Sequence, residues 1–95
     1  MSALVTATVR VKNPDKLQQY ISQVPPTMAP HGGEMLGRGK VAKSLHGDVS
    51  YQIEAIFRFP STEAVDAWYG SAEYQALTTL RDEAADMTIT VLNAF

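Results

Sequence analysis

The chain contains no cysteine among its 95 residues. This absence excludes disulfides, a thiolate zinc site and a cysteine nucleophile, and it fits a reducing compartment. No apolar run approaches the roughly 20 residues that a membrane-spanning helix needs. The first residues also lack the basic segment followed by an apolar one that marks a signal peptide. We therefore expect a cytoplasmic protein with no membrane partner.

An excess of charge of one sign is also missing. Eight Lys and Arg residues against ten Asp and Glu residues give a formal net charge of −2, with the signs interspersed. No basic stripe could neutralise several phosphates, so nucleic acid is not expected as a partner. The two histidines, His31 and His46, share no metal-ligand spacing with a carboxylate, so no metal is expected. There is no glycine-rich phosphate loop either, and we expect no cofactor.

What the chain does contain suits one small domain over residues 1–95. Three segments alternate between apolar and polar residues, which is typical of half-buried strands. They are residues 3–11, 51–59 and 87–95. A looser strand is expected from residue 34 to about 45, where glycines interrupt the pattern.

A first helix is indicated after the first strand. Asn13-Pro14-Asp15 combines an N-cap, a proline at the first helical position and an acid in the first turn. An apolar stripe at helical spacing follows as far as Val24. Pro25-Pro26 should kink or end this helix because neither proline has an N–H to donate. A further turn is expected to run to His31, before two glycines.

A second helical region precedes the last strand. Ser61 is expected to cap a short helix that presents Trp68, and Ser71 to cap another beyond the break at Gly70. We expect Arg81, with its acidic neighbours, on the solvated side of that last helix. The element order is then β-α-β-β-α-β, which predicts an α+β, ferredoxin-like fold with both helical regions on one face of an antiparallel four-stranded sheet.

The other face of that sheet would carry a mixture of residues. Leu4, Ile56 and Leu92 would lie in water there, whereas Glu54 and Arg58 would be costly in a dry core without partners. This mixture predicts that two copies pack face to face around a partly polar cavity. The alternative is an ordinary wet face with a few apolar residues.

The most informative segment lies between the third and fourth expected strands. It contains Phe59-Pro60-Ser61, Ala67-Trp68-Tyr69, Ser71, Glu73-Tyr74-Gln75-Ala76-Leu77 and Arg81. These residues resemble the signature of domain-of-unknown-function family 1330. Equivalent positions upstream are Tyr20, His31-Gly32-Gly33, Leu36, Arg38-Gly39 and Gly47-Asp48. The resemblance covers nearly the whole chain and implies the dimeric α/β-barrel superfamily, with a face-to-face homodimer.

That superfamily includes cofactor-independent monooxygenases, muconolactone-type isomerases, haem-degrading enzymes and purely ligand-binding members. The chain departs from the family pattern at Arg58, where the family often has an acid, so no role for a carboxylate there is carried over. Pro25-Pro26 also interrupts the first helix more sharply than is usual in the family.

Charged candidates for a site are Arg38, Glu54 and Arg58, which we expect to face the cavity between the copies. An arginine there would hold a carboxylate or enolate oxygen, and Glu54 would serve as a general base. The alternative is an ion pair that fixes the register of the dimer, with Glu54 bound to Arg38 or Arg10 on a neighbouring strand. His31 is a second candidate proton acceptor, or else a favourable partner for the end of its helix.

Aromatic candidates are Trp68, Tyr69 and Tyr74, which would wall a hydrophobic pocket beside a flap at Gly70. The alternative is core packing. Together the candidates predict a small-molecule-binding protein for an aromatic or polyketide-like anion, and leave open whether it is an enzyme of the monooxygenase or isomerase type. A non-catalytic homodimeric association or ligand-sensing module is the competing hypothesis. The hypothesis of haem degradation depends mainly on Trp68. It is weakened because the second helix has no well-placed histidine.

Overall fold

The computed structural model describes residues 2–95. Its elements, in chain order, are β1 (Ala3–Val11), α1 (Pro14–Met28), the 3₁₀ turn η1 (Ala29–His31), β2 (Glu34–Lys40), β3 (Ile53–Phe59), α2 (Thr62–Tyr69), α3 (Ala72–Gln75), α4 (Thr78–Ala84) and β4 (Ala85–Asn93). The strands form one antiparallel sheet in the order β2-β3-β1-β4. The predicted ferredoxin-like α+β fold is confirmed.

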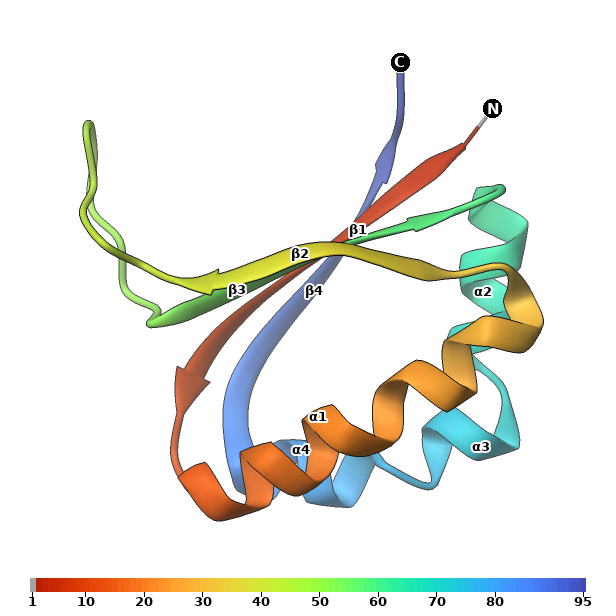
Figure 1. Ribbon diagram of the computed structural model, residues 1–95, viewed down its shortest axis with the longest axis horizontal. Coiled ribbons are helices and arrows are strands. Elements are labelled where there is room, and N and C mark those ends of the chain that lie inside the picture. Colours follow the sequence, from red (N-terminus) through yellow and green to blue (C-terminus); the bar gives the residue numbers. More distant parts are fainter. Residues whose placement is uncertain (1) are drawn as a thin grey trace.

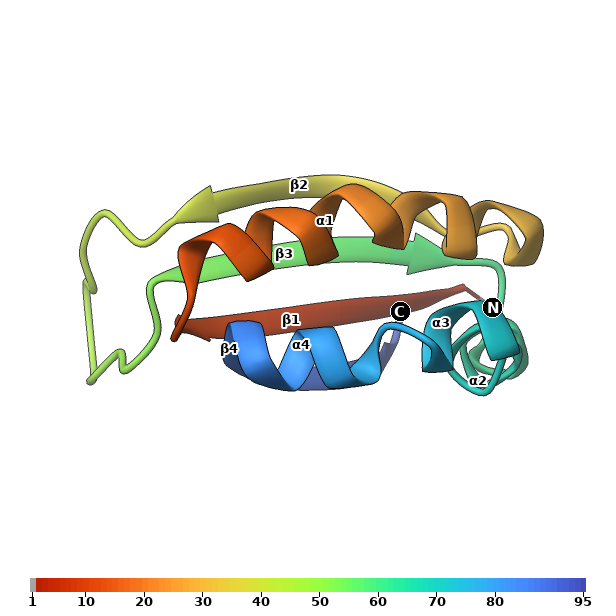
Figure 2. The ribbon, with the colours of Figure 1, turned by 90° about the horizontal axis from the view of Figure 1, so that it is seen from below.

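The register of the central strand β1 decides which side chains face the helices. Val5 lies opposite Phe57 on β3 and Val91 on β4, so these three side chains share one side of the sheet. All helices cover that side, with α1 across β2 and β3 and the other helices across β1 and β4 (Figures 1 and 2). The core therefore lies between one face of the sheet and the helical layer, and the other face is uncovered.

Helix α1 begins as predicted but does not end at the prolines. The Asn13 side chain accepts a hydrogen bond from the backbone N–H of Lys16, and Pro14 opens the helix. The helix then continues through Pro25 and Pro26, so of the two outcomes expected there, a kink or an end, the end does not occur. The two prolines are exposed, and each lacks the N–H that would bind the carbonyl four residues earlier, on Ile21 and Ser22. The apolar stripe resumes beyond them at Met28, and its burial holds the last turn in place.

Two glycines turn the chain from the helical layer into β2. Gly32 ends the 3₁₀ turn with a φ of 75°, in the left-handed region that favours glycine. A Cβ atom on Gly33 would lie 2.6 Å from the Phe59 ring, so β2 can pass Phe59 only because this residue has no side chain. The predicted end of the helical segment at this glycine pair is confirmed.

The strands β2 and β3 are shorter than expected. β2 ends at Lys40 rather than near residue 45, and β3 begins at Ile53 rather than at residue 51. Residues 41–52 instead form an arm that extends away from the body of the molecule (Figure 1). Among residues 2–95, no helix combines the length and apolarity that crossing a bilayer requires.

The last helical region is divided once more than expected. Ser61 and Ser71 cap α2 and α3 through their hydroxyl oxygens, as predicted. The helix after Ser71 stops at Gln75, and α4 starts only at Thr78. Leu77 lies between them with φ −96° and ψ −5°, and this turn keeps its side chain buried.

Candidate ligand-binding cavity

A cavity of about 70 Å³ lies between α1 and the helix-facing side of the sheet. Its walls are apolar side chains from α1 and all four strands, including Val5, Val24, Phe57 and Ile89. Tyr20 and Trp68 bring a hydroxyl and an indole to this lining. Among the described residues, one charged side chain borders the cavity, that of Arg38. The candidate site is therefore an apolar space with a single cation beside it.

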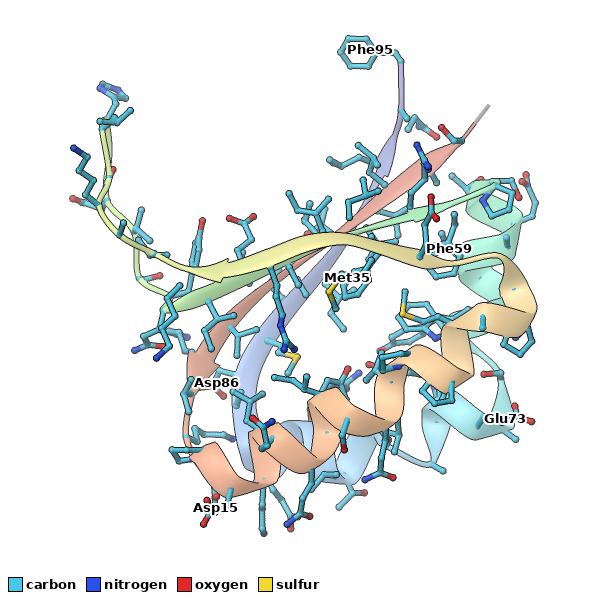
Figure 3. The ribbon with its side chains drawn as sticks, viewed as in Figure 1. Asp15, Met35, Phe59, Glu73, Asp86 and Phe95 are labelled. Atoms are coloured by element: carbon cyan, nitrogen blue, oxygen red, sulfur yellow. The ribbon has the colours of Figure 1, made fainter. Side chains whose placement is uncertain are left out.

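Arg38 reaches this cavity because of an irregularity in β2. Met35 pairs with Phe57 and Arg38 with Ala55, and the register shifts between them. The extra residue of this bulge, Leu36, moves Arg38 to the same side of the sheet as Met35. Figure 3 shows Met35 pointing from β2 toward the helical layer. Within residues 2–95, no hydrogen bond or ion pair engages the Arg38 guanidinium.

This position differs from the expected one. A strand without a bulge would put Arg38 on the uncovered face with Glu54 and Arg58, toward the expected cavity between two copies. Glycine within a strand often marks a bulge, and Gly37 was the available signal. The structure thus separates Arg38 from the other two charged candidates by the thickness of the sheet.

Glu54 and Arg58 lie on the uncovered face, as expected, but with unexpected partners. Glu54 accepts a hydrogen bond from the Tyr51 hydroxyl at 3.1 Å, not from Arg38 or Arg10. This hydrogen bond raises the pKa of Tyr51. Arg58 forms an ion pair with Glu34, its cross-strand neighbour on β2. Both side chains of that pair are about half exposed, so it contributes little to stability.

His31 closes the 3₁₀ turn η1 and is half-buried. Neither His31 nor Glu54, the two candidate proton acceptors, lines the cavity beside Arg38. The cavity therefore does not bring either candidate acceptor to the candidate anion holder, although Glu54 and Arg38 both border a separate hollow, open to solvent, at the β2 edge of the sheet. Among residues 2–95 there is also no cluster of three or more His, Asp or Glu side chains suited to a metal ion.

The three aromatic candidates occupy three different environments. Trp68 is 3% exposed, borders the cavity and donates its indole N–H to the Thr27 hydroxyl at 3.0 Å. Tyr74 is fully buried behind it, with ring centroids 4.6 Å apart. Tyr69 lies at the surface, 39% exposed. Only Trp68 of the three contacts the cavity, whereas Tyr74 packs in the core.

Sequence reasoning missed the role of Arg81. Its side chain is 16% exposed and donates through Nη1 to the hydroxyls of Tyr69, at 3.0 Å, and Tyr74, at 3.2 Å. The expected solvated position is wrong because Arg81 on α4 binds the hydroxyls of Tyr69 on α2 and Tyr74 on α3. Arg81 follows Tyr74 by seven residues, a spacing typical of one buried helical stripe. That spacing was the signal in the sequence.

The hydrogen bonds around Tyr74 and the burial of this region change the pKa values of two groups, Tyr20 and Arg81. Burial raises the pKa of Tyr20 far above its usual value, and its hydrogen bond with Tyr74 acts in the same direction. For Arg81, burial lowers the pKa, but hydrogen bonds with Tyr74, Asp82 and Tyr69 outweigh it and the pKa is raised. Tyr20 therefore stays neutral and Arg81 stays charged throughout the physiological range.

Comparison with solved structures supports the fold. A protein of unknown function from Rhodopseudomonas palustris, RPA0582, superposes with a TM-score of 0.78 at 20% identity, covering 99% of this chain and 82% of that one. A dimeric ferredoxin-like protein of unknown function from Jannaschia sp. CCS1 gives a TM-score of 0.73 at 10% identity, covering 99% and 100%. A mutant form of SnoaB, a cofactor-independent oxygenase from Streptomyces nogalater, gives a TM-score of 0.72 at 10% identity, covering 98% of this chain and 92% of that one.

Comparison with curated protein sequences found no significant match. The model of the family described as Domain of unknown function (DUF1330) matches residues 2–95, which is nearly the whole chain. The resemblance inferred from the residues around Trp68 is thereby confirmed, and the chain belongs to the DUF1330 family.

Proposed function

We propose that this protein binds a small organic anion in the cavity between α1 and the sheet, with Arg38 as the anion holder. The observation that carries this proposal is an unpaired guanidinium beside an otherwise apolar cavity. A ligand with an apolar body and one carboxylate or phenolate would bury the body and pair its charge with Arg38.

The size of the cavity limits the apolar part of this ligand. Sites for drug-sized molecules enclose roughly 300–1,000 Å³, whereas this cavity has about 70 Å³. A single ring or a short branched chain suits that space better than a multi-ring polyketide. Trp68 and Tyr20 would lie against the ring and provide aromatic contacts.

Binding without turnover is the form of the proposal that the arrangement of residues supports best. Neither His31 nor Glu54 borders the cavity, so neither is placed to take a proton from a ligand inside it. SnoaB, which shares the fold at 10% identity, is a cofactor-independent oxygenase. Chemistry of that kind would have to rely here on the aromatic lining alone.

Titration with benzoate and with benzyl alcohol tests the proposal, because the two ligands share a ring and differ in charge. We expect the wild-type protein to bind benzoate about tenfold more tightly, which corresponds to about 1.4 kcal/mol. Arg38→Gln should abolish this preference. Arg58→Gln, an arginine removed from the opposite face of the sheet, should retain it. Equal binding of the two ligands to wild type, or no binding of either, contradicts the proposal.

We also propose that a second copy of the chain covers the uncovered face of the sheet. Support comes from the apolar residues there: Ile56 is 39% and Leu92 43% exposed, and Leu92 lies opposite Leu4. The Jannaschia neighbour is described as dimeric. If the protein is instead a non-catalytic association module, this face would be its functional surface and the cavity would stay empty of ligand.

A further inference from the structure

A second hollow lies at the opposite edge of the sheet, between strand β4 and helices α2 and α4. It is open to solvent, and its volume of about 430 Å³ falls within the range of small-molecule sites. Its apolar lining includes Met87, Ile89 and Val91, all from the helix-facing side of β4, and Val65 and Trp68 from α2. Trp68, Met87 and Ile89 border both this hollow and the first cavity, so the two spaces lie back to back.

Two side chains of opposite charge, Arg81 and Asp66, also line the hollow. They do not pair with each other: the ion-pair partner of Arg81 is Asp82, at 3.0 Å. No hydrogen bond or ion pair among residues 2–95 engages the Asp66 carboxylate. The hollow therefore presents an anion and a cation that are both available to a ligand.

Hydrogen bonds through two of its nitrogens hold the Arg81 guanidinium in place and leave the third nitrogen without a partner among residues 2–95. Nε donates to Asp82, and Nη1 donates to the hydroxyls of Tyr69 and Tyr74. Nη2 has no partner among the described residues. Among residues 2–95, every buried side-chain nitrogen or oxygen atom has a hydrogen-bond partner. Since Nη2 has no partner, it is not one of these buried atoms and must be accessible to solvent. A guanidinium fixed in this way loses little freedom when it binds a carboxylate.

We propose that this hollow is a binding site for a zwitterion, an α-amino acid with an apolar side chain. Its carboxylate would bind Nη2 of Arg81, its ammonium group would bind Asp66, and its side chain would cover Met87, Ile89 and Val91. A plain carboxylate would be repelled by Asp66, and a plain amine by Arg81. A zwitterion satisfies both charges and buries the apolar part of the hollow.

Three ligands that share a phenyl ring separate these contributions. They are L-phenylalanine, 3-phenylpropionate, which lacks the amine, and phenethylamine, which lacks the carboxylate. In titrations followed by ¹⁵N NMR, we expect L-phenylalanine to give saturable shifts at the amides of Asp66, Gly70 and Val91. Measured at the amides of Asp66 and Gly70, the two single-charge analogues should bind this hollow at least tenfold more weakly.

Asp66→Asn supplies the decisive variant, because Asp66 is exposed and its replacement should not disturb the fold. We expect this variant to bind L-phenylalanine more weakly and 3-phenylpropionate more tightly than wild type does. A purely structural role of Asp66 would not produce opposite changes in the two affinities. Glu63→Gln removes an exposed acid of the same helix that does not line the hollow, and should change neither affinity.

Three results would overturn the proposal. One is equal affinity of the wild-type protein for L-phenylalanine and 3-phenylpropionate when both are measured at the amides of Asp66 and Gly70. Another is an unchanged order of affinities in Asp66→Asn. The third is a set of shifts confined to the first cavity, around Val24 and Ile53, which would assign the ligand to that cavity instead.

Discussion

The hydroxyl oxygens of Tyr20 and Tyr74 lie 2.8 Å apart in the core, although 54 positions separate the two residues in the chain. Their rings meet edge to face, with centroids 6.5 Å apart. Tyr20 belongs to α1 and Tyr74 to α3, so this hydrogen bond ties the two helical regions together beneath the sheet. Arg81 donates to the Tyr74 hydroxyl from the other side.

Tyr74→Phe should therefore cost more stability than Tyr20→Phe. Loss of the Tyr74 hydroxyl leaves the buried Tyr20 hydroxyl without a partner, which costs about 1–3 kcal/mol. It also leaves Nη1 of Arg81 with Tyr69 as its remaining partner. Loss of the Tyr20 hydroxyl leaves Tyr74 still bonded to Arg81. Urea unfolding of both variants measures the difference. The double variant should lose less than the two single losses added together, and strict additivity would show that the bond contributes nothing.

The same pair predicts how stability changes at alkaline pH. The pKa of Tyr20 in the folded protein is raised above the value of 10.0 that it has when exposed. The contribution of Tyr20 to the free energy of unfolding is therefore complete below pH 10. It is lost as the pH rises further, because Tyr20 ionises in the unfolded chain before it ionises in the folded protein. The wild-type free energy of unfolding should fall more steeply than that of Tyr20→Phe above pH 10. Parallel curves for the two proteins would contradict the raised pKa.

A third prediction concerns the glycine that lets β2 pass the core. A Cβ atom on Gly33 would lie 2.6 Å from the ring of Phe59, which is fully buried and cannot move away. Gly33→Ala should cost about 1–3 kcal/mol through overpacking. Gly39→Ala is the matched control, because a Cβ atom there would meet nothing within 4 Å. Thermal unfolding of the two variants gives the comparison, and equal losses would exclude the clash as the cause.

Local patterns in the sequence predicted the parts of the fold that depend on a few adjacent residues. The caps at Asn13, Ser61 and Ser71 and the alternation of β1 all follow from local chemistry, and all are confirmed. The failure at Pro25-Pro26 has a different origin. A local rule favoured a kink or an end there, but burial of Val24 and Met28 on either side keeps the helix from ending.

The candidate site was less predictable because one inserted residue decides it. Alternation assigns faces only if the register is unbroken, and the bulge at Leu36 moves Arg38 through the sheet. The environment of Arg81 likewise depends on two tyrosine hydroxyls, one of them from α2. Both arginines illustrate that side-chain partners depend on tertiary contacts that periodicity alone does not contain.

The uncovered face of the sheet supports a last prediction, about assembly. If a second copy covers this face, Ile56→Asp places a charge in the middle of the interface, where it would be buried without a partner. Sedimentation equilibrium should then show a particle of 10.4 kDa for the variant and twice that mass for wild type. Gln18→Asp, an exposed position on α1, adds the same charge on the helical side and should leave the larger particle intact. A wild-type protein that sediments as a single chain at micromolar concentration would mean that Leu4, Ile56 and Leu92 meet water.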